Sequence, residues 1–362
     1  MADLVYNSYA GAFSDSPRAV FEALRDEPGH RHVWLASDRH AAAFPPGVET
    51  VPYGSPAAVA ALEAADVVVA NTHTDIEWSK GPHTLYLQLW HGSPLKRVHR
   101  DILWSPPGLL DRLQRDVDRW DVLVSPNRAS TPRLRQAFRW DGEVLEIGYP
   151  RNDVLSAPDR EQRRARVRER LVIPDGATAV LYTPTFRDDA LFAERSFELG
   201  LDADAFAGAL GADHVLLLRL HYMITEELPP VDDPAVRDVS LEPEVSELYL
   251  AADVLVTDYS STMFDFAVTG RPMAFLTYDL VDFQHRLRGF YFDLAGEAPG
   301  PLVETTAELI DVLRDPEGTR ARYAERYARF RERYCHLEDG HATQRVLARL
   351  AVLPDPREAP VG

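Results

Sequence analysis

The sequence predicts an α/β protein built from two Rossmann-like domains, each around a parallel sheet. Short apolar runs alternate with amphipathic stretches along most of the chain, and this alternation is typical of βαβ units. Runs such as residues 66–71 (DVVVAN) are apolar on both faces, as expected of a strand that helices cover on both sides. The length of 362 residues exceeds one ordinary hydrophobic core and suits two domains of comparable size.

The first half of the chain contains a series of predicted strands, each a short apolar run. Amphipathic stretches at 17–26 and 55–65 lie between several of these runs and predict helices. The strands are expected at residues 4–9, 32–37, 66–71, 84–90, 121–127 and 144–150.

The second half repeats this organisation, with strands expected at residues 179–185, 214–221, 236–240, 253–260 and 273–278. After the fourth of these runs, Ser260 and Ser261 stand where a helix N-cap belongs, and Gly270 stands where its C-cap belongs. A helix between the serines and this glycine is therefore expected.

The boundary between the two domains is expected near residues 150–175. In this stretch two prolines follow a strand, and a charged helix and a turn come next. This places an N-terminal domain at 1–155 and a C-terminal domain at 156–350. The remaining residues, 351–362, are rich in proline and are expected to be disordered.

The composition restricts the classes of function. A net charge of −18, from 39 basic and 57 acidic residues, argues against nucleic acid as a partner, because a polyanion requires a basic surface. Cations are nevertheless concentrated at 96–100, 112–119 and 160–170, which suits small anionic ligands or anionic lipid headgroups. The last of these stretches also fits a solvated helix face.

The lack of a visible targeting signal leads us to expect a cytoplasmic protein. No apolar stretch is long enough to span a bilayer, and no secretory signal is visible at the start. Cys335 is the only cysteine, so the sequence predicts neither an internal disulfide nor a thiolate metal site.

Polar residues follow the predicted strand at 84–90. In an open parallel sheet, ligands bind beyond the carboxyl ends of the strands, and His91, Gly92 and Ser93 occupy that position here. Gly92 would allow the backbone to turn and to approach a ligand closely. A histidine in a loop is more often structural, but the strand end, the glycine and the neighbouring cations make His91 a candidate for function.

The strand ends of the second half carry further candidates, namely Thr183, Thr185, Arg187, Arg219, His221 and the loop from Asp258 to Thr262. The serines of this loop either only cap the following helix or also bind phosphate through hydroxyl and N–H groups at its N-terminus. Acidic residues with metal-binding spacing do not stand out, so no required metal is expected.

Several longer segments identify a family when they are taken together. They are SDSPRAVFEAL (14–24), LWHGSPLK (89–96), GYPRNDVL (148–155), YTPTFRDD (182–189), LRLHY (218–222), VSELYLAADVLVTDYSSTMFDFAVTGRPMAFLTYDL (245–280), LRGFYFDLAGEAPGP (287–301) and YCHLEDGHATQRV (334–346). In this order they resemble the CDP-glycerol glycerophosphotransferase family, the teichoic-acid primases and polymerases of bacteria. Ser93 replaces the usual threonine of this family, and His341 replaces a frequent lysine.

The resemblance implies a GT-B fold, with the nucleotide donor in the C-terminal domain. It also implies a reaction, the transfer of a polyol phosphate from a CDP-activated donor to an acceptor hydroxyl with release of CMP. CDP-glycerol is the expected donor and CDP-ribitol the alternative. No cofactor is expected beyond the substrate itself.

The resemblance also assigns roles to residues. His91 matches the proposed catalytic base, a task that suits a side chain with a pKa near neutrality. Asp258 is expected to orient its loop or a catalytic group. The donor diphosphate is assigned to His221, Arg219, Arg187, Ser260, Ser261 and Thr262, and the nucleotide ribose to Asp265 and Arg288. Arg219 could instead form a structural ion pair.

The cations after His91 are expected to hold an anionic acceptor, together with Ser93. They are Lys96, Arg97, His99 and Arg100, and the acceptor is a polyol-phosphate chain end, a soluble oligosaccharide or a lipid-linked pyrophosphate. Residues 101–121 then combine Trp104 and leucines with arginines, and form either a membrane-surface element or an ordinary amphipathic helix. The first reading would place the protein peripherally on the inner face of the membrane.

Two rival functions remain at this stage. One is a GT-B glycosyltransferase that uses a nucleotide sugar, against which the DYSS (258–261) and RGFYFD (288–293) segments argue. The other is a non-catalytic scaffold in a polymer-synthesis complex, against which the intact His91 and His221 argue. Among the family activities, addition of one unit and addition of many units are both open.

Overall fold

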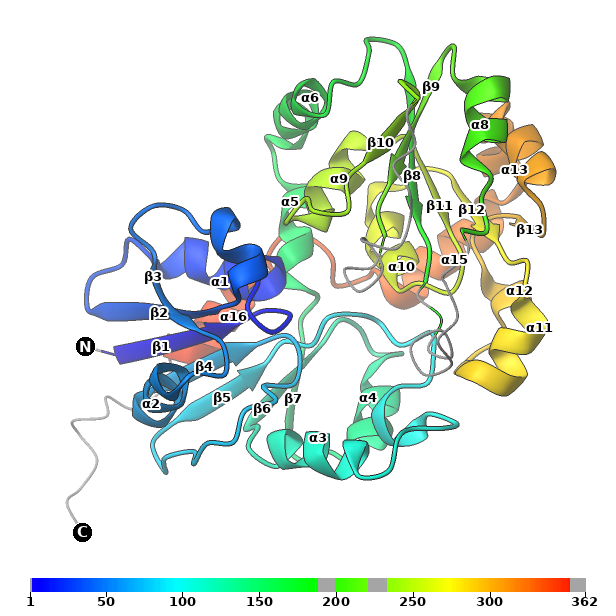
Figure 1. The fold of residues 1–362 in the computed structure, drawn as a ribbon. Helices are drawn as coiled ribbons and strands as arrows, with labels where there is room; N and C mark the ends of the chain where they lie inside the picture. Colours follow the sequence, from blue (N-terminus) through cyan, green and yellow to red (C-terminus); the bar gives the residue numbers. More distant parts are fainter. Residues whose placement is uncertain (1, 186, 188–198, 221–232, 352–362) are drawn as a thin grey trace. The chain divides into compact units, whose positions relative to one another are not determined.

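The computed structural model describes residues 2–185, 187, 199–220 and 233–351, which belong to two compact units (Figure 1). The first unit consists of Met1–Gly92, Ser105–Val154 and Leu337–Gly362, and the second of Ser93–Trp104 and Leu155–His336. Each unit contains one sheet, and the strands of both sheets pair in parallel throughout the described ranges. The predicted fold class is confirmed. The prediction for His221 and that for the tail 351–362 fall outside the described residues, except that Ala351 is the last residue of the helix Ala342–Ala351.

The first unit contains a seven-stranded sheet with the order β3-β2-β1-β4-β5-β6-β7. The strands β4, β5 and β6 are buried along their whole length, which explains why their sequences read as unbroken apolar runs. The strand β3 was not predicted, because it is an exposed edge strand that ends at Pro52 and has no apolar run. The bounds are β1 Ala2–Asn7, β2 His30–Ala36, β3 Glu49–Pro52, β4 Val67–Ala70, β5 Leu85–Gln88, β6 Val122–Ser125 and β7 Glu143–Glu146.

Helices of the first unit pack apolar faces onto this sheet. The helix α1 shows the pattern: Val20 and Phe21 enter a core cluster with Tyr6 and Trp34 of the sheet. The remaining faces are polar, as expected of an amphipathic helix. The bounds are α1 Asp15–Leu24, η1 Asp38–Ala43, α2 Pro56–Ala64, α3 Leu109–Val117, α4 Thr131–Phe138, η3 Pro150–Asn152 and α16 Ala342–Ala351, and the short helix α5 Asp153–Ser156 begins in this unit and ends in the second.

The C-terminal helix α16 belongs to the first unit, although it follows the second unit in the sequence. The carboxylate of Asp153 accepts hydrogen bonds from the backbone N–H groups of Ala342 and Thr343, at 2.9 and 2.8 Å, and so caps the start of α16. Val346 is fully buried in the core cluster of the first unit. The observed division therefore differs from the expected C-terminal domain at 156–350, because a distant cap and core contacts decide where this helix lies.

The second unit contains a six-stranded sheet with the order β10-β9-β8-β11-β12-β13. The strand β13 was not predicted, because it is an edge strand of only two residues. The bounds are β8 Thr178–Thr183, β9 His214–Leu218, β10 Val236–Asp238, β11 Val254–Thr257, β12 Met273–Leu276 and β13 Leu302–Val303.

The helices of the second unit include the one expected after residue 260. It consists of α10 and a short turn, η4, and ends at Gly270, whose φ of 72° is the left-handed conformation expected of a glycine C-cap. The bounds are η2 His99–Asp101, α6 Arg160–Arg170, α8 Ala203–Leu210, α9 Val245–Ala251, α10 Thr262–Phe266, η4 Ala267–Thr269, α11 Leu280–Asp282, the π-helical turn η5 Phe283–Leu287, α12 Leu294–Glu297, α13 Thr306–Leu313, α14 Pro316–Arg322 and α15 Ala324–Tyr334.

The arginine-rich helix α6 directs two of its cations inward. Arg164 and Arg168 both contact the carboxylate of Asp253, at 2.6 and 3.0 Å, and both donate to the carbonyl of Ala251 at the end of α9. Cations at a helix C-terminus satisfy its last carbonyls and complement its dipole. These two arginines therefore have a structural role in the second unit.

No helix within the described ranges has both the length and the apolar composition that crossing a bilayer requires.

Candidate functional site

His91 lies three residues beyond the end of the buried strand β5, and the buried Gln88 determines the direction of the chain there. Gln88, at the end of β5, accepts a hydrogen bond from the backbone N–H of Trp90 at 2.9 Å and donates one to the carbonyl of Thr72 at 3.0 Å. Trp90 has a φ of 51°, which is uncommon for a residue other than glycine. The side chain of Gln88 holds this strained turn, and the turn presents His91 beyond the sheet edge.

The contacts of His91 define which ring nitrogen can act as a base. Its Nδ1 lies 2.7 Å from the backbone carbonyl of Asn71. A carbonyl oxygen only accepts hydrogen bonds, so Nδ1 carries the proton in the neutral ring and Nε2 carries the lone pair. Burial lowers the pKa of His91 to about 4, although the bond to Asn71 acts in the opposite direction. At neutral pH the ring is therefore uncharged and ready to accept a proton at Nε2.

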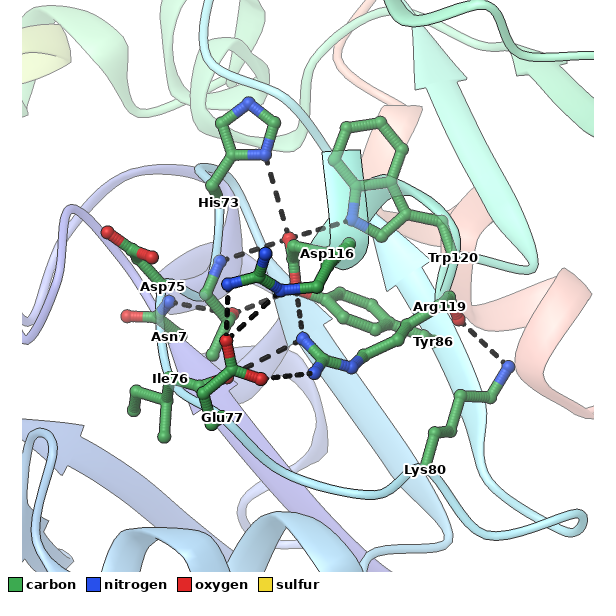
Figure 2. Close-up of polar contacts among 12 residues, drawn as sticks. Asn7, His73, Asp75, Ile76, Glu77, Lys80, Tyr86, Asp116, Arg119 and Trp120 are labelled. Atoms are coloured by element: carbon green, nitrogen blue, oxygen red, sulfur yellow. Dashed lines mark hydrogen bonds and ion pairs between the residues drawn. The ribbon is translucent and has the colours of Figure 1, made fainter. Parts of the chain in front are cut away.

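A buried carboxylate, Asp116, supports the loop after β4, and Figure 2 shows its polar contacts. Asp116, on α3, accepts hydrogen bonds from the backbone N–H of Thr74 at 3.1 Å, from Trp120 Nε1 at 3.0 Å and from the hydroxyl of Tyr86 at 3.2 Å. Asn7 in turn donates to the hydroxyl of Thr74 at 2.9 Å. The loop after β4 is thus fastened to α3 and to β1, which fixes the carbonyl that orients His91.

In the second unit, Asp258 follows β11 and is almost fully buried. Its carboxylate accepts from the backbone N–H groups of Thr185 and Tyr259, at 2.9 and 2.5 Å, and from the guanidinium of Arg187 at 2.8 Å. A carboxylate that accepts hydrogen bonds from three different residues can hold the loops that carry them in one orientation. These contacts correspond to the loop-orienting role, one of the two roles expected for Asp258.

Arg187 has protein partners for all of its donors. Its Nε and Nη2 contact both oxygens of Asp279, at 2.8 and 3.0 Å, and Nη2 also contacts the hydroxyl of Tyr278 at 3.2 Å. Its Nη1 donates to Asp258 and to the carbonyl of Thr185, at 2.8 and 2.6 Å. A guanidinium has five N–H groups, and these contacts use five. The structure thus gives Arg187 other partners than the donor diphosphate for which it was predicted.

The loop after Asp258 has two half-buried serines before α10. Ser260 accepts from the backbone N–H of Thr262 at 3.3 Å, whereas Ser261 makes no capping bond with its side chain. The hydroxyl of Thr262 lies 2.8 Å from that of Thr183, so it links β8 to the start of α10. Asp265 is buried within α10. All four predicted residues are therefore carried by one loop and the helix it starts.

Arg219, after β9, contacts the backbone. Its Nη1 donates to the carbonyls of Glu242 and Val239, at 2.7 and 3.3 Å. These bonds hold the turn beyond β10, and the role of Arg219 at the donor diphosphate stays a prediction.

The predicted acceptor cations lie in the segment Ser93–Trp104, which belongs to the second unit. Lys96 forms an antiparallel bridge with Phe290, and the backbone N–H of Arg97 donates to the carbonyl of Gly289 at 3.1 Å. Arg288 lies in the same place, with Nη1 3.5 Å from the carbonyl of Arg97. The sequence separates these two groups by nearly 200 residues, so their contact could not be predicted from spacing.

This segment has an exposed surface beside a small cavity of about 290 Å³. The cavity is lined by Arg97, Leu103, Gln284, His285, Gly289 and Phe290. Leu103 and Trp104 are 46% and 58% exposed, which is unusual for large apolar side chains. Ser93 is buried, Lys96 and Arg100 are half-buried, and Arg97 is exposed.

Residues 101–121, predicted as one element, are divided between the units. The exposed Leu103 and Trp104 lie in the second unit, whereas α3 lies in the first. On α3, Arg112 pairs with Asp75 at 3.2 Å and Arg115 with Glu77 at 2.6 Å. The helix therefore matches the ordinary amphipathic reading, and the apolar exposure is confined to the segment before it.

Sequence reasoning missed the residues that support His91. A polar glutamine in the apolar run LYLQLW was the available signal for Gln88, because an amide in a buried strand is costly unless it forms hydrogen bonds. Asp116 gave no such signal, since it occurs among other charged residues of a helix. Among the described residues no group of three or more His, Cys, Asp or Glu side chains is arranged to hold a metal ion.

Two all-parallel α/β units, with polar residues at the strand ends of each, define the GT-B class of proteins. The structure of the UDP-GlcNAc 2-epimerase from Neisseria meningitidis has the same fold, with a TM-score of 0.55 at 12% identity over 96% of this chain and 99% of that chain. The family model of CDP-glycerol:poly(glycerophosphate) glycerophosphotransferases matches residues 2–352. The chain belongs to this family, as its motifs predicted.

Individual relatives agree with this membership. The chain is 38% identical to the teichoic acid glycerol-phosphate transferase of Staphylococcus aureus, over 95% of this chain and 91% of that protein. It is 35% identical to the teichoic acid poly(glycerol phosphate) polymerase of Bacillus subtilis, over 95% of this chain but 48% of the polymerase. It therefore spans about half of that polymerase and nearly all of the transferase.

A solved structure of the wall teichoic acid polymerase TagF superimposes with a TM-score of 0.88 at 35% identity, covering 97% of this chain and 88% of that chain. A TagF variant soaked with CDPG superimposes equally well, with a TM-score of 0.89.

Proposed function

We propose that this protein transfers glycerol phosphate from CDP-glycerol to an acceptor hydroxyl and releases CMP. The observation that carries the proposal is the state of His91, whose Nδ1 is committed to the carbonyl of Asn71 and whose Nε2 is an uncharged base. Membership of the glycerophosphotransferase family and the glycerol-phosphate relatives in two genera support CDP-glycerol as the donor.

The reaction begins when the acceptor hydroxyl gives its proton to Nε2 of His91. The oxygen then attacks the phosphorus that bears glycerol, and a new P–O bond forms. The bond from this phosphorus to the bridging oxygen of the diphosphate breaks, CMP leaves with the electron pair, and the proton passes from His91 to solvent. General base catalysis of this kind contributes typically about 10²–10⁴-fold in rate.

The donor binds to the second unit in this proposal. The backbone N–H groups and hydroxyls of Ser260, Ser261 and Thr262 contact the diphosphate, and the family resemblance assigns His221 and Arg219 to the same group. Asp265 and Arg288 contact the nucleotide. Arg187 and Asp258 hold the loop in place. We assign them this role because Arg187 contacts both Asp258 and Asp279.

The acceptor is an anionic polyol-phosphate chain end, on a lipid-linked or an oligosaccharide carrier. Lys96, Arg97 and Arg100 hold its phosphates, with Ser93 beside them. The exposed Leu103 and Trp104 next to these cations support a peripheral contact with the inner face of the membrane.

The test is a donor screen with purified protein and a synthetic acceptor that carries a short glycerol-phosphate chain. CMP release and the product mass are measured with CDP-glycerol, CDP-ribitol and a nucleotide sugar. We expect CMP only with CDP-glycerol, and a product heavier by one or more glycerol phosphates. A single added mass indicates one-unit transfer, and a ladder indicates polymerisation. Saturable donor binding with no product from any acceptor would favour a scaffold, and product from another donor would overturn the assignment.

A further inference from the structure

A buried ion pair lies in the first unit and has no part in the reaction described above. Arg151, in η3, donates from Nη1 to Oδ2 of Asp15, the first residue of α1, at 2.9 Å. The two side chains are only 2% and 3% exposed. Burying a charged pair is costly and gives little net stability compared with apolar packing. A pair of this kind is therefore a candidate for a role other than stability.

Tyr9 connects this pair to His91 through direct contacts. The hydroxyl of Tyr9 donates to Oδ2 of Asp15 at 3.0 Å, and its ring lies against the imidazole of His91 with 5.6 Å between the centroids. The backbone N–H of Tyr9 donates to Oδ1 of Asn71 at 3.1 Å. Asn71 is also the residue whose carbonyl orients His91. Tyr9 and Asn71 therefore contact each other, and both contact the imidazole.

The backbone around the pair is held in sparsely populated conformations. Tyr9, Ala10 and Asp15 have φ values of 44°, 56° and 62°, all in the left-handed region that residues other than glycine rarely adopt. The Asp15 carboxylate stabilises its own strained turn by accepting from the backbone N–H of Ser16 at 2.6 Å. Such conformations persist where surrounding contacts enforce them, and they gather at functional sites.

The pair also sets the electrostatic environment of the imidazole. The negative charge of Asp15 raises the pKa of His91, the positive charge of Arg151 lowers it, and His73 after β4 lowers it too. The charges of the pair act in opposite directions, so together they leave burial as the dominant influence on the ring.

We propose that Asp15 and Arg151 are positioning residues for His91, which hold Tyr9 and Asn71 against the imidazole and present it with a balanced pair of opposite charges. The balance keeps the ring an uncharged base before the reaction. The inference rests on the proposed function in one respect, the assignment of His91 as the base.

The test is the titration of His91, followed by NMR in protein labelled at histidine Cε1 and assigned with His91→Gln. Removing Arg151 leaves an unbalanced carboxylate near the ring, so Arg151→Gln is expected to raise the titration midpoint by about one pH unit, the size typical of a nearby opposite charge. The double variant Asp15→Asn with Arg151→Gln removes both charges and is expected to return the midpoint toward that of the wild type. A purely structural role predicts that the double variant is at least as perturbed as the single one.

The control is Arg163→Gln, which breaks an exposed ion pair with Asp159 of similar length, 2.9 Å, and is expected to leave the midpoint unchanged. If Arg151→Gln does not fold, Arg151→Lys keeps the charge and is expected to keep the wild-type midpoint, while Asp15→Asn should lower it. A midpoint that stays constant in every folded variant would overturn the inference. Because the titration requires no turnover, a protein that shifts as expected but releases no CMP would contradict the proposed function, including the role of His91 as the base, and would leave standing only the positioning of His91 by the pair.

Discussion

At the scale of single residues, the account depends on one imidazole. The carbonyl of Asn71 assigns the proton of His91 to Nδ1, and burial keeps the ring uncharged. The position of this proton does not depend on a neighbouring carboxylate, because a carbonyl oxygen can only accept a hydrogen bond and Nδ1 must therefore donate it. A histidine in this state is a base at any pH above its own pKa.

The pH dependence of turnover tests this state. The uncharged form of His91 is the active form, so kcat/KM is constant above its pKa and falls about tenfold per pH unit below it. With a pKa of about 4, the profile is expected to be flat from pH 7 down to pH 5 and to fall only below that. The measurement is CMP release under limiting donor, with circular dichroism at each pH to show that the protein is folded. An acid limb near 6.5 would show that the ring is not shielded from water.

The contacts of Arg187 predict a large structural effect for a residue first considered as a phosphate ligand. Burial opposes its charge, but Asp258 and Asp279 raise the pKa of its guanidinium. Arg187→Met leaves two carboxylates without their shared cation and is expected to lower the free energy of unfolding by about 3–5 kcal/mol, as for other broken buried pairs.

Urea denaturation measures this loss, and Arg163→Met at an exposed pair provides the control, with an expected loss below about 1 kcal/mol. Equal losses in the two variants would mean that the cluster around Arg187 is not a stabilising unit. An unchanged stability for Arg187→Met, together with a raised KM for the donor, would restore the phosphate contact.

At the scale of elements, the strands buried on both faces were predictable, whereas two of the four edge strands, β3 and β13, were not. The strands β4, β5 and β11 are covered on both faces and therefore show as unbroken apolar runs. The edge strands β3 and β13 are short and have little buried surface, so no periodicity marks them. The helix after residue 260 was predictable because caps are local chemistry, and its end at Gly270 agrees.

The turn between β7 and η3 depends on a glycine for two separate reasons. Gly148 has a φ of 82°, and a Cβ there would lie 2.8 Å from the carbonyl oxygen of Leu337, the residue where the chain returns to the first unit. Gly148→Ala is expected to cost both the left-handed penalty of about 1–2 kcal/mol and the additional displacement of that carbonyl.

Gly29→Ala is the matched control, because its φ of 92° is similar and a Cβ there would meet open space. Thermal and urea unfolding of both variants should therefore show a larger loss for Gly148→Ala than for Gly29→Ala. Identical losses would mean that the backbone at Leu337 moves away without cost.

At the scale of the whole molecule, the sequence predicted two α/β domains and the family, because both follow from patterns along the chain. The division into units was not fully predictable, since it depends on contacts between distant residues. The cap of α16 by Asp153 and the bridge between Lys96 and Phe290 each join segments that are nearly 190 residues apart or more. Only the folded chain reveals such pairs.

The candidate site shows the same limit. The sequence pointed to His91 and the DYSS loop as candidates because strand ends and helix caps are local signals. Gln88, Asp116 and the pair of Asp15 with Arg151 were not found, because their roles arise from partners elsewhere in the first unit. The prediction for His221 stays a prediction.

The most direct measurement of the central claim is CMP release from CDP-glycerol by His91→Ala, with the same acceptor and with donor binding followed by calorimetry. The account predicts a loss of at least about 10²-fold in kcat with CDP-glycerol affinity unchanged, while His83→Ala, at an exposed histidine of the same unit, retains full activity. Turnover by His91→Ala within a few-fold of the wild type would contradict the assignment of the base.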